Sequence, residues 1–224
     1  MTLTEQLGLF LTSGVRHVGE IQIETNDSNN QFKLFHYSDA ERVSQPDFGG
    51  LEVFHGPSEA RQISLYGEDG AYRFLKAQRN LRRGWLMVID SLADLRLALD
   101  QFYPAALGLW VAHREGALEV EDLRHKLSRQ TGMYRRAQLL TDGGAQALVP
   151  ATCGADPACA RRILWGISPT LPLDPSPTSQ CQGILDGGAE STAIPLLCAA
   201  PCSHFIAECR EAAKREATPP PAHP

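Results

Sequence analysis

A chain of 224 residues, of which 43% are apolar, is long enough to bury a core in one large or two small domains. Its formal net charge of −5 argues against a protein that binds nucleic acid or an acidic membrane surface, because such binding needs a basic face. The first residues lack a basic segment, and no run approaches the roughly 20 apolar residues of a membrane helix, so we expect a cytoplasmic protein.

The first third of the chain has the pattern of a small α+β domain. Alternating apolar and polar residues on both sides of the turn sequence NDSNN predict a β-hairpin. The predicted elements are a helix over 2–12, hairpin strands over 19–25 and 31–38, a strand over 49–56, and a helix from Pro57 that ends before the GEDG turn. We predict that this domain spans residues 1–78.

Three histidines, His17, His36 and His55, lie on or beside these predicted strands. None has a second histidine at the i+2 or i+4 position, where two imidazoles could share a metal ion. We therefore expect structural or surface roles for them.

A strand followed by a helix opens the next part of the chain. Residues 84–90 have a strongly β-like composition, and Ser91 with Asp94 resembles a capping box. Apolar residues at helical spacing follow on one face.

Helical spacing continues from residue 104 towards Cys153, where Pro150 and Gly154 are expected to end the last helix of this series. We predict a mainly helical, cysteine-rich domain over residues 79–213 and a disordered tail over 214–224. The fold class expected for the whole chain is therefore α+β.

The six cysteines all lie in the last third of the chain, and four of them form two close pairs, Cys153 with Cys159 and Cys198 with Cys202. Two pairs that fold together place four thiolates around one point, as a tetrahedral metal ion or a cuboidal iron–sulfur cluster requires. Clustered cysteines in a reducing compartment favour metal binding over disulfides. The two pairs are the candidate metal centre.

The spacing within the pairs leaves two metals open. Structural zinc usually takes its thiolates from C-x2-C to C-x4-C hairpins, whereas the first pair here is C-x5-C and the second is C-x3-C. A cluster accepts looser spacings, but the ferredoxin run C-x2-C-x2-C-x3-C-P is absent. Spacing alone favours a [4Fe-4S] cluster and zinc about equally.

The surroundings of the pairs add weaker predictions. Cys202 precedes a predicted helix whose first amides would point at its sulfur, which favours a ligand. Cys209 lies two helical turns further on and is expected to be a small buried side chain, and Cys181 lies in a Pro/Ser-rich loop. Arg161 and Arg162 could stabilise thiolates or be surface charges.

Several segments resemble a known family. CGADPACARRILW and CAAPCSHFIAECREA, with FYPAALGLW and SRQTGMY upstream, resemble the C-terminal part of multidomain proteins related to the sirohydrochlorin cobaltochelatases of cobalamin synthesis. In those proteins chelatase-like domains precede a stabilising domain and a domain that binds a [4Fe-4S] cluster through four cysteines. The resemblance implies a stabilising domain over residues 1–78. It also implies that the cluster ligands are Cys153, Cys159, Cys198 and Cys202.

Three functions compete. The leading hypothesis is a cluster domain that transfers electrons or stabilises the fold in tetrapyrrole or cobalamin metabolism, with a separate chelatase subunit or a redox protein as partner. The second is a zinc-stapled interaction module with no redox role. The weakest is an enzyme that acts on a tetrapyrrole with His113 or His125 as metal carrier, because no His/Glu pair accompanies them. We predict no catalytic residue.

Overall fold

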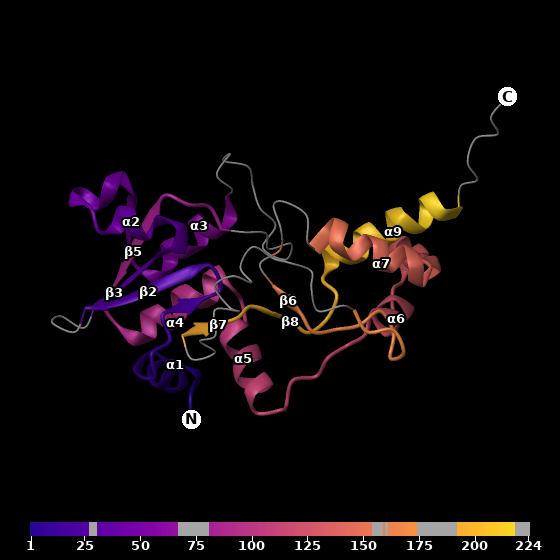
Figure 1. Cartoon of the computed structure of the whole chain (residues 1–224), viewed down its shortest axis with the longest axis horizontal. Coiled ribbons are helices and arrows are strands. Elements are labelled where there is room, and N and C mark those ends of the chain that lie inside the picture. The colour runs from indigo at the N-terminus through magenta and orange to yellow at the C-terminus, as the bar shows by residue number, and fades with distance from the viewer. Residues whose placement is uncertain (27–30, 67–80, 154–158, 160, 174–191, 218–224) are drawn as a thin grey trace.

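The computed structural model describes residues 1–26, 31–66, 81–153, 159, 161–173 and 192–217. Two units lie side by side, each with its own hydrophobic core, and the first is built on a sheet while the second is mainly helical (Figure 1). This arrangement confirms the predicted α+β fold class. No helix in the described residues is long and apolar enough to cross a membrane.

The first unit contains a six-stranded sheet with the order β4-β5-β3-β2-β1-β7. Its strands are β1 (His17–Val18), β2 (Ile21–Asn26), β3 (Gln31–His36), β4 (Glu52–His55), β5 (Trp85–Ile89) and β7 (Ala193–Ile194). Strands β2 and β3 pair antiparallel, with Ile23 opposite Leu34, as the alternating sequence predicted. The β4–β5 and β1–β7 pairs are parallel and join segments far apart in the chain.

Helices cover the sheet, and the helices and the strands contribute equally to the first core. They are α1 (Leu3–Thr12), α2 (Ala40–Val43), α3 (Ala60–Leu65), α4 (Leu92–Phe102) and α5 (Ala106–Arg114), with short 3₁₀ helices η1 (Tyr37–Asp39), η2 (Pro46–Gly50) and η3 (Pro57–Glu59). The predicted cap of α4 is present, because the Asp94 backbone N–H donates to Ser91 Oγ at 3.1 Å. Trp85 and Phe102 stack in this core with ring centroids 4.9 Å apart.

The first unit continues well past residue 78. The division expected between residues 78 and 79 lies outside the described residues. Beyond it, β5 pairs with β3 and β4, and the same core extends to Leu107. The residues from 81 to 114 therefore pack with the first unit rather than with the cysteine-rich one, because their strand completes its sheet and their helices cover it.

A buried carboxylate ties this later segment to the start of the sheet. Glu20 Oε2 accepts hydrogen bonds from the Leu81 backbone N–H at 2.9 Å and from the Tyr103 hydroxyl at 3.3 Å. The Nε2 atom of buried His36 lies 3.5 Å from Glu20 Oε1. These groups satisfy one another, so His36 has the structural role expected of it.

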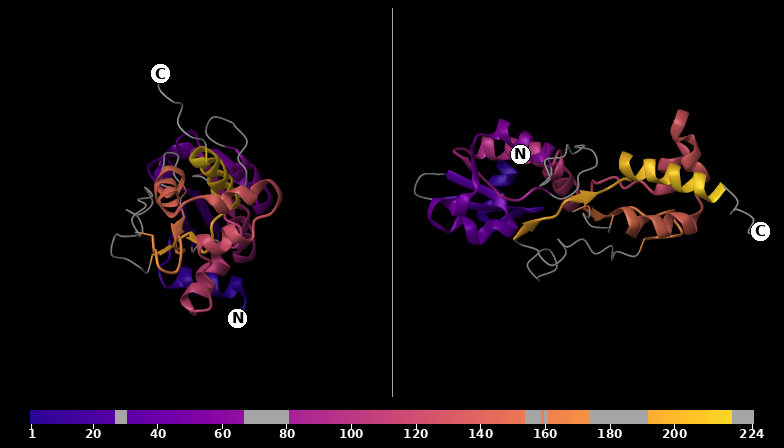
Figure 2. Two further views of the ribbon diagram at one scale, coloured as in Figure 1. Left: turned by 90° about the vertical axis from the view of Figure 1, so that its right-hand side faces the viewer. Right: turned by 90° about the horizontal axis from the view of Figure 1, so that it is seen from above.

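Within the described residues, the second unit has four helical segments and a two-stranded sheet around its own core. The elements are α6 (Leu123–Ser128), the 3₁₀ helix η5 (Gly132–Leu139), α7 (Asp142–Cys153), β6 (Arg162–Ile163), β8 (Leu197–Cys198) and α9 (Ser203–Ala217). Figure 2 shows the chain that carries β7 and β8 running from the sheet of the first unit into the second.

Helix α9 extends to Ala217, into the stretch 214–224 that was expected to be disordered. Two contacts explain the extension: Ala213 is buried in the second core, and the Glu216 carboxylate accepts hydrogen bonds from the backbone N–H and hydroxyl of Thr141, both at 3.1 Å. The prediction of disorder is therefore wrong for residues 214–217, and residues 218–224 lie outside the described part of the chain.

Candidate metal centre

Each of the four candidate cysteines lies at the end of a secondary-structure element or next to one. Cys153 is the last residue of α7, as predicted, although Pro150 lies inside that helix and does not end it. The Cys159 backbone N–H donates to the Cys153 carbonyl at 3.3 Å, which holds the two residues of the first pair together. Cys198 ends β8, and Cys202 directly precedes α9.

A short parallel ladder joins the two pairs. Strand β6 begins three residues after Cys159, and β8 contains Cys198. Ile163 is the register partner of Cys198, and the Leu164 backbone N–H donates to the Cys198 carbonyl at 3.0 Å. These contacts hold Cys198, of the second cysteine pair, beside strand β6, which follows the first pair in the chain.

The four thiols lie within electrostatic range of one another. Burial is the main reason that the pKa of the Cys153 thiol is raised, and the charges of Cys159, Cys202 and Cys198 raise it further. Burial raises the pKa of Cys198 to about 11, and Cys202 and Cys159 contribute to that rise. Thiols of one pair therefore raise the pKa of a thiol in the other pair, which places the two pairs within electrostatic range, and the buried Cys209 contributes to the rise at Cys153 as well.

Hydrogen-bond donors point at three of these four sulfurs. The Trp165 indole N–H donates to Cys198 Sγ at 3.3 Å, and the Phe205 backbone N–H at the start of α9 donates to Cys202 Sγ at 3.5 Å. Burial raises the pKa of Cys159, and a backbone hydrogen bond from Arg161 opposes that rise. Such donors stabilise thiolates, so the site suits anionic sulfur ligands of a metal centre.

The two arginines behave differently. The Arg161 guanidinium donates from Nη1 to the Leu197 carbonyl at 3.0 Å, and its charge lowers the pKa of both Cys159 and Cys198. Arg162 is exposed on β6. Of the two roles left open from the sequence, Arg161 takes the electrostatic one and Arg162 the surface one.

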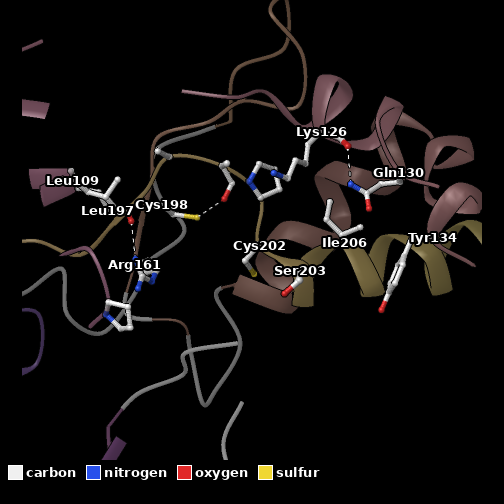
Figure 3. Close-up of a pocket in the computed structure, with 14 residues that line it drawn as sticks. Leu109, Lys126, Gln130, Tyr134, Arg161, Leu197, Cys198, Cys202, Ser203 and Ile206 are labelled. Carbon is white, nitrogen blue, oxygen red and sulfur yellow. Dashed lines mark hydrogen bonds between the residues drawn. The ribbon is translucent and has the colours of Figure 1, made fainter. Parts of the chain in front are cut away.

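A pocket of about 820 Å³ opens beside Cys198 and Cys202 (Figure 3). Its other walls come from both units: Pro104 and Leu109 from the first, and Lys126, Gln130, Tyr134, Arg161, Leu197, Ala199, Ala200, Pro201, Ser203 and Ile206 from the second. Cys202 is exposed, so one side of the candidate centre faces solvent.

Cys209, His113 and His125 do not line this pocket. Cys209 is completely buried in the second core, as predicted, and Cys181 lies outside the described residues. His113 lies beside Trp110, with ring centroids 5.8 Å apart, and His125 is exposed, 3.5 Å from Glu121. Among the described residues, no three His, Cys, Asp or Glu side chains are close enough to hold a single metal ion.

The sequence did not reveal the role of Trp165. It was expected to be a core residue, and it is buried with its ring 5.3 Å from that of Phe205. Its indole N–H nevertheless points at a cysteine 33 positions away. The only available signal was the position of an aromatic donor shortly after Cys159, and that signal does not say which sulfur it meets.

Comparisons with known proteins bear on both units. Residues 4–114 match the family model of the DR2241 stabilising domain, and residues 115–211 match the model of a 4Fe-4S iron–sulfur cluster binding domain. The meeting point of these matches agrees with the extent of the first core. No curated protein sequence matches the chain.

A solved structure with the same fold is DR2241 from Deinococcus radiodurans, described as a multi-domain protein with structural similarity to chelatases and two additional novel domains. It is 25% identical in sequence, with a TM-score of 0.71. The match covers 95% of the present chain and 42% of that one. The present chain therefore spans less than half the length of this relative.

Proposed function

The chain belongs to the families of the DR2241 stabilising domain and the 4Fe-4S iron–sulfur cluster binding domain, and on that premise we propose that Cys153, Cys159, Cys198 and Cys202 hold a [4Fe-4S] cluster that transfers electrons. The observation that supports the proposal is the β6–β8 ladder, which joins the two segments that carry the cysteine pairs, with the thiols within electrostatic range of one another. The zinc reading loses support because the matching family model describes an iron–sulfur domain.

The residues around the sulfurs fit such a centre. A bound [4Fe-4S] cluster supplies a one-electron couple, and four protein thiolates leave no open iron for substrate. The Trp165 indole N–H, the Phe205 backbone N–H and the Arg161 charge each stabilise negative charge on a ligand sulfur. Because the reduced centre is the more negative one, these groups favour reduction and raise the potential.

The biological setting is also part of the proposal. The similarity to a multi-domain protein that resembles chelatases supports a role beside metal insertion into a tetrapyrrole, as in cobalamin synthesis. In that role the chain would deliver electrons in the cytoplasm to a chelatase domain or subunit, or receive them from a redox partner.

Anaerobic purification tests the metal. We expect a brown protein with about four iron and four sulfide ions per chain, as a four-thiolate cubane implies. Alanine at any one of the four cysteines should lower the iron content, whereas Cys209→Ala should retain it. Stoichiometric zinc without iron, after expression with ample iron, would replace the proposal with a zinc-stapled interaction module.

A further inference from the structure

The 3₁₀ helix η5 presents one buried and one exposed row of side chains. Residues three apart lie above one another in this kind of helix. The row of Tyr134, Ala137 and Leu140 faces the second core, where Ala137 and Leu140 are almost completely buried. The opposite row starts at Met133, which is 68% exposed, and ends at Leu139, which is 70% exposed. Two large apolar side chains on one short ridge are thus left in water.

Cationic side chains lie on and beside this ridge, because Arg136 falls between Met133 and Leu139 in the same row. Arg129, Arg135 and Arg136 are all exposed. Arg129 is paired with Glu121, with 3.2 Å between Nη1 and Oε1, whereas neither Arg135 nor Arg136 forms an ion pair with another residue in the described ranges. Residues 121–140 carry five arginine or lysine side chains and two carboxylates, within a chain whose net charge is −5. The ridge and its three arginines therefore form a local basic surface on an acidic protein, which we call the η5 patch.

The η5 patch lies next to the candidate metal centre. Gln130 and Tyr134, from the same segment, line the pocket that Cys198 and Cys202 also line (Figure 3). Gln138 Nε2 donates to the carbonyls of Ser128 and Gln130 at 3.2 and 2.8 Å, which fixes η5 against the end of α6. The patch therefore lies on a segment that also lines this pocket, as does the exposed Cys202.

We propose that the η5 patch docks an acidic electron-carrier protein, which exchanges one electron with the cluster; this inference rests on the proposed function. Methionine and arginine are both enriched in protein interfaces relative to the rest of a protein surface, and the patch combines them. Opposite charges steer a carrier to the right face and speed its association, and electron-transfer interfaces are typically small and weak. The two exposed apolar side chains favour a protein over a nucleic acid, whose contacts are mainly ionic.

A flavodoxin is a suitable probe because it is an acidic one-electron carrier. One electron leaves its flavin hydroquinone anion, which becomes the neutral semiquinone, and reduces the cluster from the 2+ to the 1+ state. No proton has to move. The rate can be followed by stopped-flow absorbance, with the cluster-loaded full chain as acceptor.

The decisive variants reverse charges on the patch. We expect Arg135→Glu and Arg136→Glu together to slow association with reduced flavodoxin about tenfold at low ionic strength, and added salt to reduce the difference. The control for either single reversal, Arg135→Glu or Arg136→Glu, is Arg61→Glu, which changes the net charge by the same amount at an exposed position on α3 in the first unit and should retain the wild-type rate. Met133→Ala with Leu139→Ala should speed dissociation and leave the salt dependence unchanged. Oxidised cytochrome c, a basic acceptor, should react faster with the charge-reversed protein than with the wild type.

Three results would overturn the inference. The first is equal rates for the wild type and the double charge reversal. The second is an equal loss of rate in Arg61→Glu. The third is tighter binding of a short DNA duplex or of anionic vesicles than of oxidised flavodoxin. Reduction by dithionite distinguishes the two proposals. If dithionite reduces the cluster but flavodoxin does not, the docking surface alone is refuted. If dithionite cannot reduce the cluster, electron transfer itself is refuted.

Discussion

Removing the indole donor of Trp165 should lower the reduction potential of the centre without removing it. Trp165→Phe keeps an aromatic ring in the core but loses the N–H that donates to Cys198 Sγ at 3.3 Å. The four cysteines are unchanged, so iron content should remain at the wild-type level. Because the donor stabilises the more negative, reduced state, its loss favours the oxidised state.

The size of the shift follows from the energy of one hydrogen bond. A net energy of about 1 kcal/mol corresponds to about 40 mV for a one-electron couple. The donor also stabilises the oxidised state, so only part of this energy affects the potential, and we expect a decrease of about 20–40 mV. Redox titration followed by electron paramagnetic resonance measures it.

A second variant controls for the cavity that the smaller ring leaves. Phe205→Leu removes a ring that packs 5.3 Å from Trp165 but keeps the backbone N–H that donates to Cys202 Sγ. It should destabilise the second core by about 1–3 kcal/mol and leave the potential nearly unchanged. An unchanged potential in Trp165→Phe, or an equal shift in both variants, would show that the indole donor does not tune the centre.

Three further outcomes are expected. Cys209→Ala should keep its iron, and denaturant titration should show a free energy of unfolding that is lower by about 1–2 kcal/mol. Loss of iron in this variant would identify Cys209 as a ligand. Burial raises the pKa of the Cys209 thiol from its ordinary value of 9.0 to about 12, so the thiol loses its proton at lower pH in the unfolded state than in the folded state. The free energy of unfolding of the wild type should therefore fall relative to that of Cys209→Ala only above pH 9. Parallel stability curves at every pH would contradict the assigned burial. Cys198→Ser should lose iron, and protease should then cleave residues 115–217 faster while residues 4–114 persist. The reason is that ligand bonds present only in the folded state stabilise the unit that makes them. Mass spectrometry monitors the cleavage, and equal cleavage of both units would indicate one cooperative fold.

The sequence predicted the elements whose evidence is local. The alternation in β2 and β3 and the cap of α4 depend on residues a few positions apart, and both are present. The burial of Cys209 also followed from local spacing, because it lies seven positions after Cys202 on the same helix.

Long-range pairing could not be predicted in this way. Strand β5 was grouped with the helices that follow it, yet its partners are β3 and β4. Strands β6, β7 and β8 have two residues each, too few to show an alternating pattern. They nevertheless join the cysteine pairs and return the chain to the first sheet, so tertiary contacts rather than propensity fix them.

The candidate site was predictable in composition but not in arrangement. The two cysteine pairs stood out by their spacing, whereas the donors to their sulfurs did not. The indole of Trp165 and the guanidinium of Arg161 reach the site only after β6 pairs with β8. Helical structure was expected on towards Cys153, but its type was not: α6 ends at Ser128 and a 3₁₀ helix begins at Gly132, whose φ is +57°. This change of helix type creates the exposed ridge.

The most direct test of the central claim is the Mössbauer spectrum of iron-loaded protein purified without oxygen. If the four cysteines hold a [4Fe-4S] cluster, the spectrum should show one cubane centre per chain whose irons all have sulfur ligands, and Cys153→Ala should lose that signal. A wild-type spectrum of isolated mononuclear iron, or a protein that binds only zinc under the same conditions, would contradict the account.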